Sequence, residues 1–168
     1  MIIIVIYTII SFLLDGLVSN YLPSSITSLS PLITIYSVIS LVIIYNFFEE
    51  EKPYLKILII LAILFDIVYT NTFILSIILF LAVYLFIKKT NYYIPNNLFT
   101  INVKSLLAIS IYHVLTYIIF LLVNYNNYPI KLLFIILYKS IIMTIIYTTI
   151  SYIFLGKIYY KYYDKKIK

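Results

Sequence analysis

The chain of 168 residues contains no cysteine and no tryptophan, and it also lacks arginine and glutamine. The absence of cysteine excludes disulfide bonds, redox-active cysteine pairs and cysteine-based metal sites. The chain has only two glycines, Gly16 and Gly156, so it has no glycine-rich loop that could hold a phosphate. Acidic residues are also scarce. Only six are present, and Asp15 and Asp66 are the two that fall within apolar segments.

Hydrophobic residues, in contrast, make up 64% of the chain, and charged residues only 11%. Soluble domains have about 45–50% apolar and about 25% charged residues. Each apolar run is near or above the length of about 17–25 residues that crosses a bilayer. The sequence therefore predicts an all-α integral membrane protein, with six transmembrane helices in one bundle over residues 1–155 and a basic cytoplasmic tail over 156–168. The runs are Ile2–Tyr21, Leu32–Phe48, Tyr54–Tyr69, Phe73–Ile87, Ser105–Val123 and Leu132–Leu155.

The third and fourth runs are separated only by Thr70-Asn71-Thr72. A single helix through both runs would have about 33 residues and a length of roughly 50 Å, which exceeds one bilayer. We therefore predict a tight helical hairpin that turns at these three residues.

The lysines predict the orientation, because cytoplasmic connections are enriched in them. Ten of the twelve lysines fall in connections or termini that an even number of helices places on one side. Both termini are thus expected in the cytoplasm of a bacterial plasma membrane. The first run lacks a basic leading segment and a signal-peptidase site, so we interpret it as a retained helix. Lysines beside anionic membrane lipids account for the net charge of +6 without a nucleic-acid partner.

A carboxylate inside a membrane-spanning helix costs several kcal/mol and usually has a partner or a function. Counted along their helices, Asp15 and Asp66 both lie at a depth of roughly 18–20 Å, and Lys139 enters the same half of the bilayer from the other side. One hypothesis is a buried cluster of two carboxylates and one ammonium. The alternatives are that Lys139 snorkels to the interface, that Asp15 bonds to nearby backbone, and that Asp66 bonds into the Tyr69–Thr72 turn.

His113 is the only histidine, and Ser110, Thr116 and Tyr117 lie on the same face of its helix. This polar stripe predicts a histidine that faces the bundle interior. A single histidine without acids on its helix argues against a metal site, and no cofactor is expected. An intramembrane hydrolase that uses Asp15 and Asp66 is the enzyme alternative. Neither acid has the glycine-rich flanks expected of such enzymes, so no catalytic residue is assigned.

Three segments carry a family resemblance, namely Phe12–Asn20, Pro31–Thr34 and above all Ala62–Ser76. Together they resemble the rod shape-determining protein MreD family of low-GC Gram-positive bacteria. That family has Gly-Leu-Leu-Tyr-Asp-Ile-x-Tyr-Thr-x-Thr-Leu-Gly-x-Asn around the hairpin. In this chain Ala62 and Ile74 stand at the two glycine positions and Ser76 at the asparagine position.

The resemblance implies a non-enzymatic membrane component of the cell-elongation complex. Such a component acts with an MreC-like protein and links MreB filaments to the RodA–transpeptidase pair. The six-helix arrangement of the family also resembles the substrate-binding subunits of energy-coupling-factor transporters, so a vitamin-binding subunit is the alternative function. The intramembrane polar residues expected to hold helices together or contact a partner are Asp15, Asp66, Asn71, His113 and Lys139.

Overall fold

The computed structural model describes residues 2–21, 34–48, 50–70, 72, 74–124 and 129–163, and these residues form helices without any β-strand. The all-α prediction is therefore confirmed for this part of the chain. Its helices are α1 (Ile2–Tyr21), α2 (Tyr36–Ile44), the 3₁₀ turn η2 (Tyr45–Phe47), α3 (Glu51–Phe65), the π-helical turn η3 (Asp66–Thr70), α4 (Leu75–Tyr93), α5 (Leu98–Leu122) and α6 (Ile130–Tyr163).

Four helical segments are long and apolar enough to cross a membrane. They are α3 with η3, α4, α5, and α6 as far as Ile158. The other two apolar segments, over 2–17 and 36–47, are shorter. The structure thus supports a multi-pass membrane protein, and the two further spans stay a prediction.

The expected hairpin between the third and fourth runs is present as α3–η3 followed by α4, so the alternative of one long helix is wrong. Several helices extend beyond the apolar runs. α4 continues from Ile87 to Tyr93, α5 begins at Leu98 rather than Ser105, and α6 continues beyond Leu155 to Tyr163. The apolar runs stop at the first charged residue, whereas a helix continues until its backbone is capped. A reciprocal capping box between Asn97 and Thr100 sets the start of α5.

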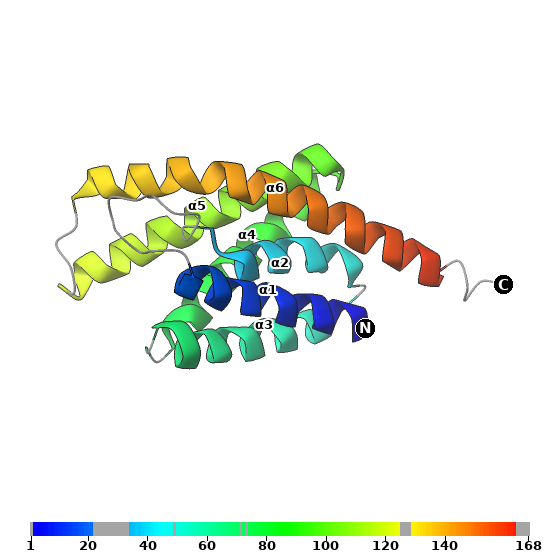
Figure 1. Ribbon diagram of the computed structural model, residues 1–168, viewed down its shortest axis with the longest axis horizontal. Helices are drawn as coiled ribbons and strands as arrows, with labels where there is room; N and C mark the ends of the chain where they lie inside the picture. Colours follow the sequence, from blue (N-terminus) through cyan, green and yellow to red (C-terminus); the bar gives the residue numbers. More distant parts are fainter. Residues whose placement is uncertain are drawn as a thin grey trace.

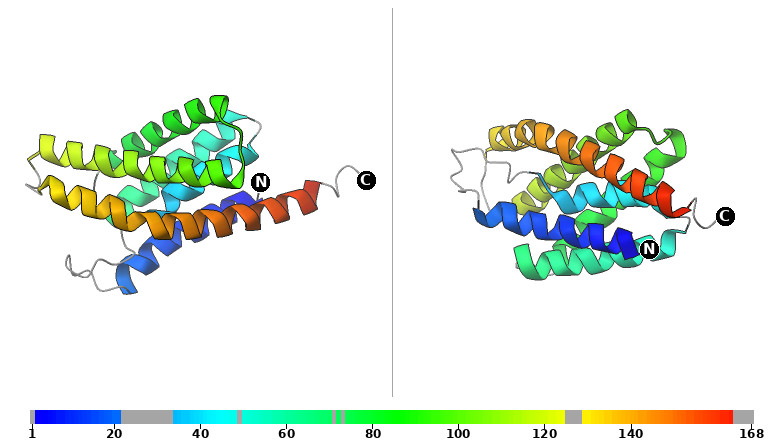
Figure 2. Two further views of the ribbon diagram at one scale, coloured as in Figure 1. Left: turned by 90° about the horizontal axis from the view of Figure 1, so that it is seen from above. Right: turned by 45° about the vertical axis from the view of Figure 1, so that its right-hand side comes forward.

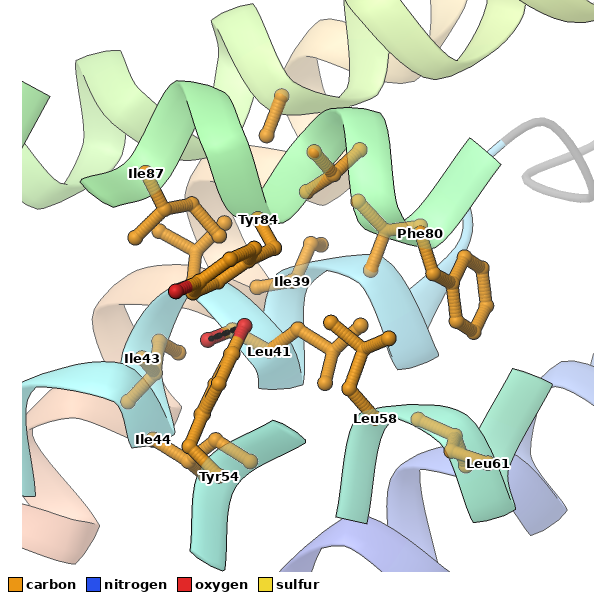
Figure 3. Packing of buried hydrophobic residues seen from close by; sticks show 14 of the residues in the cluster. Ile39, Leu41, Ile43, Ile44, Tyr54, Leu58, Leu61, Phe80, Tyr84 and Ile87 are labelled. Carbon is orange, nitrogen blue, oxygen red and sulfur yellow. Dashed lines mark hydrogen bonds between the residues drawn. The ribbon is translucent and has the colours of Figure 1, made fainter. Parts of the chain in front are cut away.

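The short helix α2 is the centre of the bundle. All nine of its residues are buried, and it contacts α1, α3, α4, α5 and α6. Figure 1 shows it between α6 on one side and α1 and α3 on the other. In Figure 3 its isoleucines and Leu41 pack against Tyr54 and Leu58 of α3 and against Tyr84 of α4. A helix that is apolar all round is stable only when it is enclosed in this way.

The helices alternate in direction, so α1 begins and α6 ends at the same end of the bundle (Figures 1 and 2). We call this the lysine end, because Lys88 and Lys104 lie there beside the C-terminal turns of α2 and α4. The opposite end, where Asp15 and Asp66 meet the N-termini of α2 and α4, is the carboxylate end. The expected cytoplasmic location of the lysine end remains a prediction.

Helix α1 contacts η3 closely at Gly16. The Tyr69 hydroxyl donates a 2.6 Å hydrogen bond to the backbone oxygen of Phe12, and the two rings are 4.8 Å apart. A Cβ atom built on Gly16 would lie 2.5 Å from the Tyr69 hydroxyl oxygen. Gly156, in contrast, has no neighbouring atom within 4 Å of such a Cβ. Only the first glycine therefore makes room for a neighbouring helix.

We predict that Gly16→Ala destabilises the protein by about 1–3 kcal/mol, because the new methyl group displaces Tyr69 from its hydrogen bond. Gly156→Ala is the matched control and should be neutral or stabilising by up to about 1 kcal/mol, because alanine favours helix. The measurement is the free energy of unfolding of both variants in the same detergent. Equal effects of the two substitutions would contradict the Gly16–Tyr69 contact.

Candidate functional site

Asp15 caps the N-terminus of α2. Its Oδ1 accepts a 2.7 Å hydrogen bond from the backbone N–H of Tyr36, and its Oδ2 accepts a 3.0 Å bond from the N–H of Ser37. The Ser37 hydroxyl also donates to Oδ2. The first N–H groups of a helix have no partner within it, and the helix dipole places partial positive charge there. Asp15 therefore supplies both the acceptors and the negative charge that this buried helix end needs.

Asp66 does the same for α4. Its Oδ1 accepts a 2.9 Å hydrogen bond from the backbone N–H of Ser76, the second residue of α4. The hydroxyls of Thr70 and Thr72 donate to the same oxygen at 3.1 and 3.0 Å. Asp66 is only 4% exposed, and it is the first residue of η3. These bonds agree with the expected bond of Asp66 into the Tyr69–Thr72 turn. In addition, Asp66 bonds to α4, the helix that follows this turn.

The turn before α4 has one strained residue. Ile74 has a φ of 75°, in the left-handed region that β-branched residues rarely adopt. It is also one of the two positions at which the family pattern that the sequence resembles has a glycine. A glycine at this position would adopt the same conformation without a steric penalty.

The hypothetical cluster of Asp15, Asp66 and Lys139 does not form. Among the described residues the only ion pair joins Lys88 and Glu51, and no lysine nitrogen lies within 4.0 Å of either aspartate. The physical reason is that each carboxylate is occupied by a different helix N-terminus. Lys139 is half-buried on α6, and Asn71 lies outside the described residues.

The lysine end contains a polar network that the sequence analysis missed. Lys104 is 2% exposed, and its Nζ donates to Asn91 Oδ1 and Asn96 Oδ1 at 2.6 Å and to the carbonyl of Ile94 at 3.0 Å. The Asn91 amide donates to Asn46, which in turn donates to carbonyls in the last turn of α2. This network places positive charge and donors at the C-terminal turns of α4 and α2, where carbonyls lack partners.

His113 stands at the margin of the core rather than inside it. The buried stripe of α5 consists of Ile101, Lys104, Ser105, Ala108, Ile109 and Tyr112. His113 and the polar residues on its face are half-buried, and the hydroxyls of Ser110 and Thr116 donate to carbonyls of their own helix. The predicted polar stripe is thus only partly enclosed by the bundle, and the hydroxyls of Ser110 and Thr116 are satisfied within α5. Within the described part of the chain, no group of three histidine, cysteine or acidic residues could hold a metal.

Comparison of the chain with protein-family models, with curated proteins and with solved structures gives no match.

The two caps differ in one hydroxyl, and this difference gives a prediction. Ser37 and Ser76 are each the second residue of the capped helix, but only the Ser37 hydroxyl donates a hydrogen bond of normal geometry to its aspartate, whereas the Ser76 hydroxyl lies beside Asp66 without one. A hydrogen bond to a charged group contributes about 1.5–3 kcal/mol. We expect Ser37→Ala to lower the free energy of unfolding by that amount and Ser76→Ala to lower it less. A larger loss in Ser76→Ala would contradict this assignment.

The strain at Ile74 gives a second prediction. A left-handed conformation costs a non-glycine residue roughly 1–2 kcal/mol, and Ile74 is 53% exposed, so little packing is lost on its replacement. Ile74→Gly should therefore raise the melting temperature in detergent, by about 2–4 °C for each kcal/mol gained. Ile78→Gly is the matched control, since Ile78 is 54% exposed in the regular helix α4 and its replacement should be destabilising. A destabilised Ile74→Gly variant would exclude the proposed strain.

Proposed function

We propose that this protein is a non-enzymatic membrane component of the bacterial cell-elongation complex. In this proposal its six helices cross the plasma membrane with both termini in the cytoplasm. It acts with an MreC-like protein, and through it with MreB filaments and the RodA–transpeptidase pair.

The observation that carries the proposal is the structure of the hairpin at 62–76, the segment with the strongest family resemblance. Three features of the family pattern form the same turn before α4 in this chain. The aspartate caps α4, the threonines Thr70 and Thr72 donate to that aspartate, and the glycine position, Ile74, has a left-handed φ. A pattern whose residues all serve the same turn supports a resemblance of structure as well as of sequence.

The arrangement of the two acids supports a role without catalysis. A hydrolytic carboxylate pair needs its two groups within a few Å, where they share a proton. Here Asp15 bonds to the start of α2, and Asp66 bonds to the start of α4. Their oxygens are acceptors for helix N–H groups, and this role positions helices rather than a reacting water.

We predict that depletion of the protein from its rod-shaped host gives rounded, widened cells with unchanged uptake of riboflavin, biotin and folate. Re-expression of the natural sequence or of Gly156→Ala should restore rods. Asp15→Ala and Asp66→Ala should restore them poorly, because each leaves buried N–H groups unpaired, at about 1–3 kcal/mol per group. Cell width and vitamin uptake are measured in the same cultures, and protein levels by immunoblot.

Rods of normal width together with a vitamin requirement would contradict this function and favour the transporter-subunit alternative. Co-purification provides the second readout. The natural sequence should retain an MreC-like partner in mild detergent, and a failure to retain it at normal expression would also contradict the proposal.

A further inference from the structure

The spacing of charges along α6 defines where this helix meets the membrane surfaces. Between Lys139 and Lys157 there are 17 residues, none of them charged. At 1.5 Å per residue they extend about 26 Å, close to the roughly 30 Å of a hydrocarbon layer. Lys139 therefore lies near the boundary of that layer at the carboxylate end, and Lys131 lies two turns farther out.

A shallow, open and almost wholly apolar hollow lies at this boundary on the surface of α6. We call it the α6 hollow, and the described residues that line it are Ile130, Lys131, Phe134, Ile135, Tyr138 and Lys139. Their spacing places them on one face of α6. Phe134 and Tyr138 are 63% and 75% exposed, so this face points away from the helices of the bundle.

Lys131 and Lys139, which border the α6 hollow, form no ion pair with the described residues. The only ion pair among the described residues is at the opposite end of the bundle, between Lys88 and Glu51. At the carboxylate end, Asp15 and Asp66 are occupied by helix N-termini. Two ammonium groups beside an apolar surface at the membrane boundary favour a ligand that carries negative charge next to hydrocarbon.

We propose that the α6 hollow binds an anionic phospholipid from the leaflet at the carboxylate end, with an acyl chain against its apolar lining and the phosphate beside the ammonium groups of Lys131 and Lys139 at its edge. Lys131 and Lys139 are separated by about 12 Å along the helix, and their long flexible stems allow both ammonium groups to reach one headgroup. Phe134 and Ile135 face the acyl chain, and Tyr138 lies at the interface that tyrosine prefers in membranes. This site does not depend on the proposed cell-elongation function.

The chain has no tryptophan, so a single introduced tryptophan reports on its local lipid. We would place it by Tyr138→Trp and reconstitute the protein in vesicles that mix phosphatidylglycerol and phosphatidylcholine. One of the two lipids carries brominated acyl chains that quench tryptophan fluorescence. Ile10→Trp is the matched control, because Ile10 is 49% exposed on α1, away from the hollow.

Each lysine beside an anionic surface contributes about a fivefold preference, so two predict a preference for phosphatidylglycerol of up to roughly 25-fold at low salt. Tyr138→Trp should show it, and Ile10→Trp should be quenched equally by both lipids. Adding Lys131→Gln and Lys139→Gln to Tyr138→Trp should abolish the preference, whereas the same two positions changed to arginine should keep it. Equal quenching in Tyr138→Trp, a preference that survives both glutamines, or no quenching by either lipid would overturn the proposal.

Discussion

The structure depends on the hydrogen bonds between buried carboxylates and the N-termini of buried helices. A helix end enclosed by apolar side chains has N–H groups that neither water nor its own backbone can satisfy, and each costs several kcal/mol in a membrane. Asp15 gives α2 two acceptor oxygens, and Asp66 gives α4 one. The central helix can therefore begin inside the bundle, and every other helix packs around it.

Positive charge stabilises the C-terminal ends of the same helices. Lys104 reaches the C-terminal carbonyl of α4 directly, and Asn91 and Asn46 extend the network to the end of α2. Helix α4 thus has a carboxylate at its positive end and an ammonium at its negative end, an arrangement that favours one direction of the helix over the other. The bundle uses its few interior charges to fix helix direction and position.

Residue type alone predicted the helical class and the α3–α4 hairpin, because long apolar runs and a three-residue polar break determine both. The partner of Asp15 could not be predicted, since it is the backbone N–H of Tyr36, which lies 21 residues away and has no signature of its own. Lys104 was expected in the connection before the fifth apolar run, because a hydropathy pattern ends an apolar run at each charged residue. The pair Asn97 and Thr100 could have indicated the true start of α5, since polar residues at this spacing are typical of a helix N-terminus.

This use of the interior charges has a consequence for recognition. Since Asp15, Asp66 and Lys104 all bond to backbone of neighbouring helices, the outer faces of α1 and α6 consist mainly of large aliphatic and aromatic side chains. Such faces make close contacts with lipid or with another apolar helix, but they contribute little selectivity, because lipid tails are equally apolar. Selective recognition must then come from the helix ends, where Lys131 and Lys139 carry charges that the fold has not used.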